Sequence, residues 1–123
     1  MSCVFCGFPT EKRLLENEYA FAFYDVYPVQ KGHLLIVPKK HIASYFDAST
    51  EEIIAMHELL HSGKRLLDEK YQPDAYNIGV NVGEHGGQTI MHLHMHLIPR
   101  YKGDMKDPRG GIRKAIPNLV PYP

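Results

Sequence analysis

The sequence of 123 residues has no tryptophan, only two cysteines and no excess of charge of either sign. Its 14 lysine and arginine residues balance its 14 aspartate and glutamate residues, whereas proteins that coat nucleic acid or an anionic membrane carry a basic excess. No apolar run approaches the roughly 18 residues of a membrane span. We therefore expect no nucleic-acid partner and no membrane partner, and we expect any anionic ligand to be small and bound locally.

The N-terminal residues 1–13 also lack the basic region and apolar core of a signal peptide, which favours a cytoplasmic protein. Cys3 and Cys6 are spaced C-x-x-C. In a reducing compartment this spacing indicates half of a zinc site or a redox pair rather than a structural disulfide. Redox pairs usually follow a strand and open a helix. Because this pair stands at the start of the sequence, zinc is favoured, and a disulfide between the two cysteines is the alternative.

The first half of the sequence predicts a hairpin followed by a helix. Residues 18–24 are apolar and aromatic, and residues 33–38 are apolar up to a proline, so both are typical of buried strands. The segment 25–32 between them contains turn residues, which makes an antiparallel hairpin the simplest arrangement. Ser49 followed by Glu52 forms a capping-box pattern and predicts a helix from about Thr50 to Tyr71.

The second half predicts two more strands, and no internal repeat or linker interrupts the chain. The strands are expected at 74–82 and 90–98, separated by a flexible polar loop at 83–88. Beyond Tyr101 the chain is rich in proline, glycine and mixed charges, and an irregular segment is expected. The predicted fold class is α+β, with a mainly antiparallel sheet packed against one long helix, in a single domain spanning 1–123.

Residues 57–61 read HELLH and match the H-E-x-x-H pattern of zinc metalloproteases. That pattern places two histidines one helical turn apart and needs a third ligand. Residues 62–71 contain no further histidine, and His57 and His61 fall on the polar side of the predicted helix. We therefore interpret this motif as a solvated helix face rather than a metal site.

Residues 92–97 read HLHMHL, with three histidines alternating with apolar residues. In a strand, His92, His94 and His96 would share one face at intervals of about 6–7 Å. Zinc needs its ligands within about 2.0–2.3 Å, so three histidines spread along a straight strand do not readily reach one ion. A solvent-facing stripe explains three histidines poorly, and we expect neighbouring histidines to have separate roles.

The same residues fit the pattern H-φ-H-φ-H-φ-φ (φ apolar) of the histidine triad, or HIT, superfamily. Three further segments resemble that superfamily in the same order, up to about Tyr101: the N-terminal CVFC, the run KGHLLIVPKKHI and the run NVGEHGGQTIMHLHMHLIPRY. The sequence therefore resembles a bacterial-type, zinc-binding HIT nucleotide hydrolase. The resemblance implies a HIT-like fold.

Members of this superfamily are mostly hydrolases and transferases that act on a phosphate attached to a nucleoside. The resemblance implies that His94 is the catalytic nucleophile, which attacks the α-phosphorus and forms a nucleotidyl-histidine that water hydrolyses. Attack needs a lone pair on one ring nitrogen, and a hydrogen bond from the other N–H to a backbone carbonyl would fix that tautomer. By the same resemblance, His96 and His33 are catalytic residues that contact the phosphate and support the nucleophile.

The resemblance also implies a substrate-binding set around the triad. Asp25 would accept hydrogen bonds from the ribose hydroxyls, and His96 would contact the phosphate. Phosphate oxygens would be bound by the side chains of Asn81 and Gln88, with help from the backbone N–H groups of Gly86, Gly87 and Thr89. Purely structural roles stay open for three of these positions: a turn at Asp25, a strand cap at Asn81 and a strand end at His33.

In the zinc-binding members, the resemblance places a structural zinc on Cys3, Cys6, His41 and His92. This site would pin the zinc-binding N-terminal segment 1–10 to the sheet. The tail 102–123 resembles tails of dinucleoside polyphosphate hydrolases, and Arg100, Arg109 and Arg113 would reach additional phosphates there; a solvated or dimer-contacting tail is the alternative. Family members are commonly homodimers paired through the helix and a strand edge.

The implied function is a nucleotide phosphohydrolase that cleaves at the α-phosphate of a nucleotide conjugate. A dinucleoside polyphosphate, a nucleoside phosphoramidate and an acyl-nucleotide all remain possible substrates. One alternative is a nucleotidyltransferase, which would use the same intermediate with a different acceptor. The alternative from another class is a purine-nucleotide-binding or interaction module with little turnover.

Overall fold

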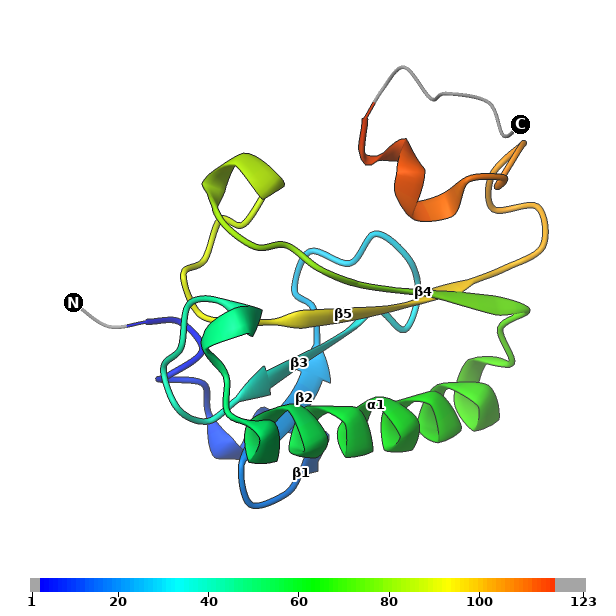
Figure 1. The fold of residues 1–123 in the computed structure, drawn as a ribbon. Helices are drawn as coiled ribbons and strands as arrows, with labels where there is room; N and C mark the ends of the chain where they lie inside the picture. Colours follow the sequence, from blue (N-terminus) through cyan, green and yellow to red (C-terminus); the bar gives the residue numbers. More distant parts are fainter. Residues whose placement is uncertain (1–2, 117–123) are drawn as a thin grey trace.

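The computed structural model describes residues 3–116. In it, one long helix covers one face of an antiparallel sheet of five strands, as Figure 1 shows. The strands lie in the order β1-β2-β3-β5-β4. In chain order the elements are η1 (Thr10–Lys12), β1 (Leu15–Glu16), β2 (Ala20–Tyr24), β3 (Leu34–Pro38), η2 (Tyr45–Asp47), α1 (Thr50–Tyr71), β4 (Ala75–Val80), η3 (Glu84–Gly86), β5 (Met95–Arg100) and η4 (Gly111–Ala115), where η denotes a 3₁₀ helix. The predicted fold class is confirmed.

The predicted hairpin is present as β2 and β3, which pair antiparallel from Ala20 opposite Pro38 to Tyr24 opposite Leu34. Side chains alternate between the two faces of a strand. Ala20 and Ala22 of β2 therefore pack against α1, whereas the alternating aromatic residues of that strand pack against Phe5 and Phe8 of the N-terminal segment. Both faces of the hairpin are covered, which explains why its sequence is apolar almost throughout.

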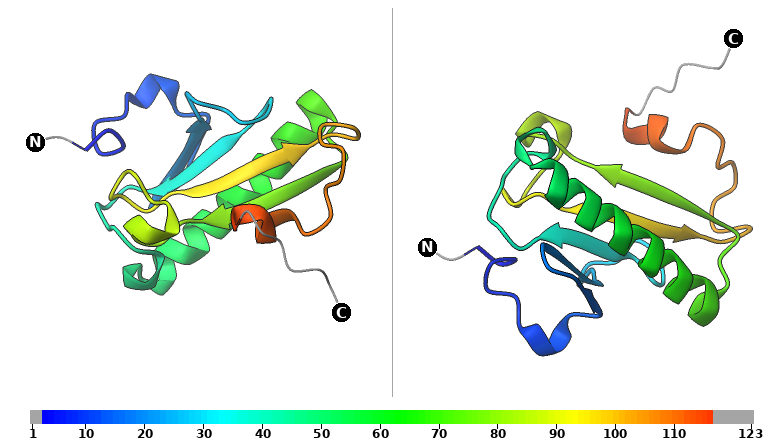
Figure 2. Two further views of the ribbon diagram at one scale, coloured as in Figure 1. Left: turned by 90° about the horizontal axis from the view of Figure 1, so that it is seen from above. Right: turned by 60° about the horizontal axis from the view of Figure 1, so that its bottom comes forward.

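Helix α1 has the bounds that the sequence predicts, and its capping box forms as predicted. The side chain of Ser49 accepts from the N–H of Glu52, and the Glu52 carboxylate accepts from the N–H of Ser49. Gly63 is buried at the contact with the sheet, where an added Cβ would lie 3.1 Å from a methyl group of Leu34. The absence of a side chain there lets the helix approach β3 closely. The right-hand view of Figure 2 shows the helix lying across the sheet.

The prediction of a strand over 90–98 is wrong at its start, because β5 begins at Met95. Before Met95, the backbone groups that would extend the pairing of β3 with β5 have other partners. The ring of His92 bonds to the carbonyl of Pro38, the N–H of Leu93 donates to the carbonyl of Ile42, and the ring of His94 bonds to the carbonyl of His92. Pro38 also has no N–H to offer. The first two histidines of the motif therefore lie on an irregular segment and not on a straight strand.

The sequence also missed the short strand β1 and the 3₁₀ helix η4 in the segment expected to be irregular. Two residues of strand give little periodicity to detect. Figure 1 shows η3 and η4 on the side of the sheet opposite α1. This outer face carries the histidine motif. Residues 117–123 of the predicted tail lie outside the described residues.

Helix α1 is 22 residues long and bears charged residues along its length. Within residues 3–116, no helix is both long enough and apolar enough to cross a membrane.

Candidate functional site

Four side chains from three parts of the chain converge on one point: Cys3, Cys6, His41 and His92. Sγ of Cys3 lies 3.4 Å from Nδ1 of His92, Sγ of Cys6 lies 3.3 Å from Nδ1 of His41, and the two Nδ1 atoms are 3.2 Å apart. Tetrahedral zinc, with bonds of about 2.3 Å to sulfur and 2.0–2.1 Å to nitrogen, places S and N about 3.5 Å apart and two N atoms about 3.3 Å apart. These four donors therefore fit a zinc ion without rearrangement.

The ring of His92 is oriented for this point by the backbone. Its Nε2 lies 2.8 Å from the carbonyl oxygen of Pro38, and a carbonyl only accepts, so Nε2 carries the proton. The Nδ1 lone pair of the neutral ring is then directed at the two cysteines. Burial is the largest cause lowering the pKa of His92, which favours the neutral form that binds metals.

His94 has the opposite tautomer. Its Nδ1 lies 2.8 Å from the carbonyl oxygen of His92, so Nδ1–H donates and the lone pair of the neutral ring is on Nε2. This is the contact to a backbone carbonyl that a nucleophilic histidine was expected to need. Within the described residues, Nε2 has no hydrogen-bond partner. The ring itself is buried, with the rings of Phe5 and His96 as neighbours at centroid distances of 5.2 Å each.

His96 is oriented through His33. The N–H of Val29 donates to Nδ1 of His33 over 3.2 Å, so the proton of the neutral His33 ring is on Nε2. That Nε2–H lies 2.9 Å from Nδ1 of His96, which places the proton of His96 on its own Nε2. Burial is the largest cause lowering the pKa of His33, and it lowers the pKa of His96 to about 4. Both rings are therefore neutral near pH 7.

His33 is bonded through both of its ring nitrogens. These partners are the N–H of Val29 and the ring of His96, and only 3% of the surface of His33 is exposed. The contacts present here assign His33 to holding His96 in one tautomer, and its predicted contact with a phosphate stays untested.

Asp25 lies beside this pair. Its Oδ2 is 3.5 Å from Nε2 of His33, and its Oδ1 accepts from the N–H of Tyr27 over 3.0 Å. The second contact is the turn role that was left open for this residue. The carboxylate is half-buried at the edge of the histidine cluster, and the ribose contact stays a prediction.

The loop before the triad is stabilised by Gln88, which is buried. Its amide donates to the carbonyls of Ala43 and Ile90 over 2.8 and 3.0 Å, and its oxygen accepts from the N–H of Gly83 over 2.9 Å. In this conformation no amide hydrogen is left for a phosphate. The predicted phosphate contact of Gln88 stays untested, and the contacts present here assign its side chain to positioning the loop.

The other predicted phosphate-binding positions are exposed on this loop. Asn81 lies beside Gly87, where an added Cβ would meet the Asn81 amide at 3.8 Å and where φ is +100°, a conformation that favours glycine. The N–H groups of Gly86 and Gly87 are already bonded to the carbonyls of Gly83 and Glu84. Among residues 3–116, no partner is found for the N–H of Thr89.

The H-E-x-x-H motif has none of this organisation. His57 and His61 are exposed on α1, with ring centroids 4.6 Å apart. No third metal-binding side chain joins them among the described residues. The interpretation of a solvated helix face is consistent with this position.

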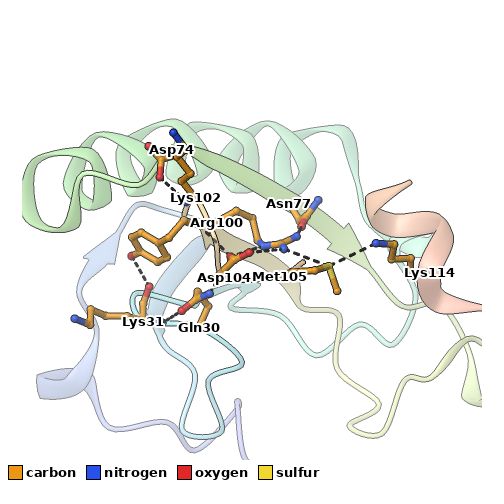
Figure 3. Close-up of polar contacts among 10 residues, drawn as sticks. Gln30, Lys31, Asp74, Asn77, Arg100, Lys102, Asp104, Met105 and Lys114 are labelled. Atoms are coloured by element: carbon orange, nitrogen blue, oxygen red, sulfur yellow. Dashed lines mark hydrogen bonds and ion pairs between the residues drawn. The ribbon is translucent and has the colours of Figure 1, made fainter. Parts of the chain in front are cut away.

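The tail after β5 turns back toward β4, as Figure 1 shows, and Figure 3 shows the polar contacts of this region. Arg100 makes a bidentate pair with Asp104 at 2.9 Å and also donates to Asn77 over 2.6 Å. Asp104 in turn accepts from Gln30, and Arg100 is the main cause holding the pKa of Asp104 well below its usual range. In this conformation Arg100 is bonded to groups of the protein, and the prediction that it reaches additional phosphates stays untested.

Sequence reasoning missed three features of the tail and the site. A cavity of about 690 Å³ lies between the tail and β4, and no histidine lines it; nothing in the sequence marks it. Arg109 pairs with Asp107 in the exposed tail, a pairing that their spacing of two residues allows. The aromatic residue inside C-x-F-C was a signal that sequence reasoning passed over, since Phe5 contacts the triad.

Comparison with known proteins shows which family this chain resembles. A family model described as the HIT domain matches residues 9–103. An uncharacterized 16.1 kDa HIT-like protein of Mycoplasma pneumoniae is 38% identical over 105 residues, covering 82% of this chain and 73% of the relative. The adenosine 5′-monophosphoramidase of Saccharomyces cerevisiae is 32% identical over 115 residues, covering 90% and 67%. The asymmetrical bis(5′-nucleosyl)-tetraphosphatase of Schizosaccharomyces pombe is 27% identical over 104 residues, covering 84% and 57%.

Solved structures give the same result. A zinc-bound histidine triad family protein of Mycobacterium smegmatis has a TM-score of 0.77 and 33% identity, covering 87% of this chain and 81% of that structure. A HIT family protein of Bacillus subtilis has a TM-score of 0.76 and 33% identity, covering 84% and 76%. The match of fold, sequence and histidine pattern over most of the chain leads to one conclusion: this protein belongs to the HIT family.

Proposed function

We propose that this protein is a nucleotide phosphohydrolase that cleaves at the α-phosphate of a nucleotide conjugate through a nucleotidyl-His94 intermediate. The observation that carries the proposal is the tautomer of His94, whose Nδ1–H donates to the carbonyl of His92 and leaves the Nε2 lone pair available. The family contains relatives named as phosphoramidase and dinucleoside tetraphosphatase. Both activities break a bond at a phosphorus atom.

In the first step, Nε2 of His94 attacks the α-phosphorus, and the bond to the leaving group breaks with its electron pair. The imidazole ring gains positive charge in this step. The carbonyl of His92 then accepts a charge-assisted hydrogen bond from Nδ1–H, which is stronger than the neutral one. A polyphosphate leaving group needs little proton donation, whereas an amine must gain a proton as it leaves, and solvent water supplies that proton.

His96 supplies a second hydrogen bond to the reacting phosphate. Because its Nδ1 accepts from His33, its Nε2–H is available as a donor, and we assign that N–H to a phosphate oxygen. The N–H of Thr89, and the Asn81 side chain beside Gly87, would bind the other oxygens. Asp25 would hold the ribose hydroxyls, as the family resemblance implies.

In the second step, water attacks the phosphorus of the intermediate. The P–N bond breaks, its electron pair returns to Nε2 of His94, and a proton from the water passes to solvent. The products are the nucleoside monophosphate and the free enzyme. The substrate classes we propose are nucleoside phosphoramidates and dinucleoside polyphosphates.

The four-residue Cys/His cluster would hold a structural zinc ion, which when bound cross-links the N-terminal segment to the sheet. The support is the donor set and its spacing. We also propose a cytoplasmic homodimer paired through α1 and the free edge of β4. An apolar groove there is lined by Leu60, Tyr76, Ile78 and Leu97 among others, and Ile78 is 48% exposed. Light scattering coupled to size exclusion tests the dimer, and a monomer mass would reject it.

The experiment for the reaction compares wild type with His94→Asn on adenosine phosphoramidate and diadenosine tetraphosphate. We expect turnover of the preferred substrate to fall about 10³-fold or more, while binding of adenosine monophosphate persists in calorimetry. Rapid acid-free quenching with labelled substrate should trap a protein-bound nucleotide in wild type only. His57→Asn is the matched control, because it changes an exposed histidine outside the site.

Unchanged turnover in His94→Asn would reject the proposed mechanism. If wild type turns over neither substrate but binds adenosine monophosphate tightly, the protein is a nucleotide-binding module.

A further inference from the structure

Phe5 connects the two halves of the histidine cluster. It stands between Cys3 and Cys6, and it is only 4% exposed. Its ring meets His92 edge-on, with centroids 5.6 Å apart and an interplanar angle of 89°, and it meets His94 at 5.2 Å and 66°. One residue of the cysteine segment therefore touches both a predicted metal ligand and the proposed nucleophile.

The turn that carries Phe5 is itself well held. The N–H of Gly7 donates to the carbonyl of Cys3 over 3.0 Å, and the N–H of Phe8 donates to the carbonyl of Phe5 over 3.2 Å. Phe23 packs against Phe5 at 5.6 Å. Two cysteines that contact His41 and His92 flank this turn, so the ring of Phe5 has a fixed place on the outer face of the sheet.

His94 needs such a neighbour because its backbone lies outside the ladder. The hydrogen bond from Nδ1–H to the carbonyl of His92 fixes the tautomer, but a single hydrogen bond still permits the ring to rotate out of line. An edge-to-face contact between planar rings is favourable over a limited range of angles. Packing against Phe5 therefore restricts the rotation that would move Nε2 away from the phosphorus.

We propose that Phe5 is a positioning residue for His94, so that the cysteine segment orients the nucleophile as well as attaching the N-terminus. The proposal rests on the proposed function for its kinetic consequence, but the orientation itself can be measured without turnover. Misplacement of a reacting group by about 1 Å can cost on the order of 100-fold in rate. The rate effect should therefore exceed the effect on substrate binding.

The test substitutes Phe5→Leu, which keeps an apolar side chain and removes the planar ring. Phe8→Leu is the matched control: Phe8 stacks on Phe23 at 3.9 Å and lies near Phe21 at 5.8 Å, and it makes no ring contact with a histidine. Both variants shorten an aromatic residue of the same segment. Only Phe5→Leu removes the contact with His94.

We expect Phe5→Leu to lower kcat about tenfold or more, with KM changed less than about twofold and zinc still bound at one ion per chain. In ¹⁵N correlation spectra, His94 of Phe5→Leu should show shifts averaged between tautomers, whereas Phe8→Leu should retain the Nδ1–H pattern and the wild-type kcat. If Phe5→Leu does not fold, Phe5→Met, which fills a similar volume flexibly, replaces it.

Two results would overturn the proposal. One is an unchanged kcat and unchanged His94 spectrum in a folded, metal-loaded Phe5 variant. The other is an equal loss of kcat in the Phe5 and Phe8 variants, which would indicate a general loss of stability. If wild type has no activity at all, the proposed function fails, and the spectrum of His94 still decides the role of Phe5.

Discussion

The chain contains two histidine motifs, H-E-x-x-H at 57–61 and H-x-H-x-H at 92–96. The first lies on the exposed face of α1, where the two rings lie beside each other. The second lies where three histidines leave or enter the sheet, and each ring is bonded to a fixed partner. The difference is in what holds the rings and not in how many histidines there are.

The hydrogen-bond partner of each histidine ring determines which of its two ring nitrogens carries the proton. His92 and His94 donate to carbonyls that can only accept, through Nε2 and Nδ1 respectively. His96 receives a hydrogen bond from His33. Adjacent members of one motif therefore present different nitrogens, which allows one to bind a metal and the next to attack phosphorus. A histidine in solvent has no such selection.

The largest difference between the motifs should appear when one ligand histidine is removed. His92→Ala should abolish stoichiometric metal binding and lower the thermal midpoint strongly, because structural zinc contributes on the order of 10 kcal/mol in small peptides. His57→Ala should change neither. Elemental analysis and thermal unfolding measure both quantities. Full metal content in His92→Ala, or loss of metal in His57→Ala, would reverse the assignment of the two motifs.

The next difference concerns the loss of folding stability at low pH. Burial lowers the pKa of His96 from the ordinary 6.5 to about 4. Between these two pH values the His96 ring is protonated in the unfolded chain and neutral in the native protein. Stability from this residue is complete above pH 6.5 and is lost as the pH falls toward 4. The loss should be roughly 2 kcal/mol between pH 7.5 and pH 5.

Urea unfolding of wild type, His96→Gln and His57→Gln at these two pH values measures this loss. Acidification should cost His96→Gln less stability than wild type, and His57→Gln as much as wild type. Loss of metal on acidification is common to all three proteins and cancels in the comparison. Equal losses in all three would show that His96 titrates normally.

A smaller effect is expected when the partner of His96 is removed. His33→Ala leaves Nδ1 of His96 without its donor, so the ring can adopt either tautomer. We expect kcat to fall about tenfold to a hundredfold, with metal content unchanged, while His57→Ala retains wild-type kcat. Steady-state kinetics on the preferred substrate checks this. A wild-type kcat in His33→Ala would show that His96 needs no orientation.

Much of the fold could be predicted because its signals are local. The helix follows from Ser49, Glu52 and apolar periodicity, and the hairpin follows from two apolar runs around a turn. The start of β5 could not be predicted, since it depends on side chains of His92 and His94 bonding to carbonyls that the ladder would otherwise use. The alternation of histidine and apolar residues looks the same in the sequence whether or not these side-chain hydrogen bonds interrupt the strand.

The residues that gather at the site could be predicted, but the hydrogen bonds between them could not. Family resemblance brought the four Cys/His residues together, and the structure places them within 4.8 Å. It did not indicate that His33 bonds to His96, that the Gln88 side chain is fully bonded to backbone groups including the carbonyl of Ala43, or that Asp104 pairs with Arg100. These contacts join residues distant in sequence or depend on rotamers, and no local pattern encodes them.

Backbone and neighbour contacts give the histidines of this motif different, fixed tautomers. Two-bond ¹⁵N–¹H correlation spectra of the metal-loaded wild-type protein at neutral pH test it directly. We expect a proton on Nδ1 for His94 and on Nε2 for His33, His92 and His96. A spectrum with His94 protonated at Nε2, or with His94 averaged between tautomers, would contradict this assignment.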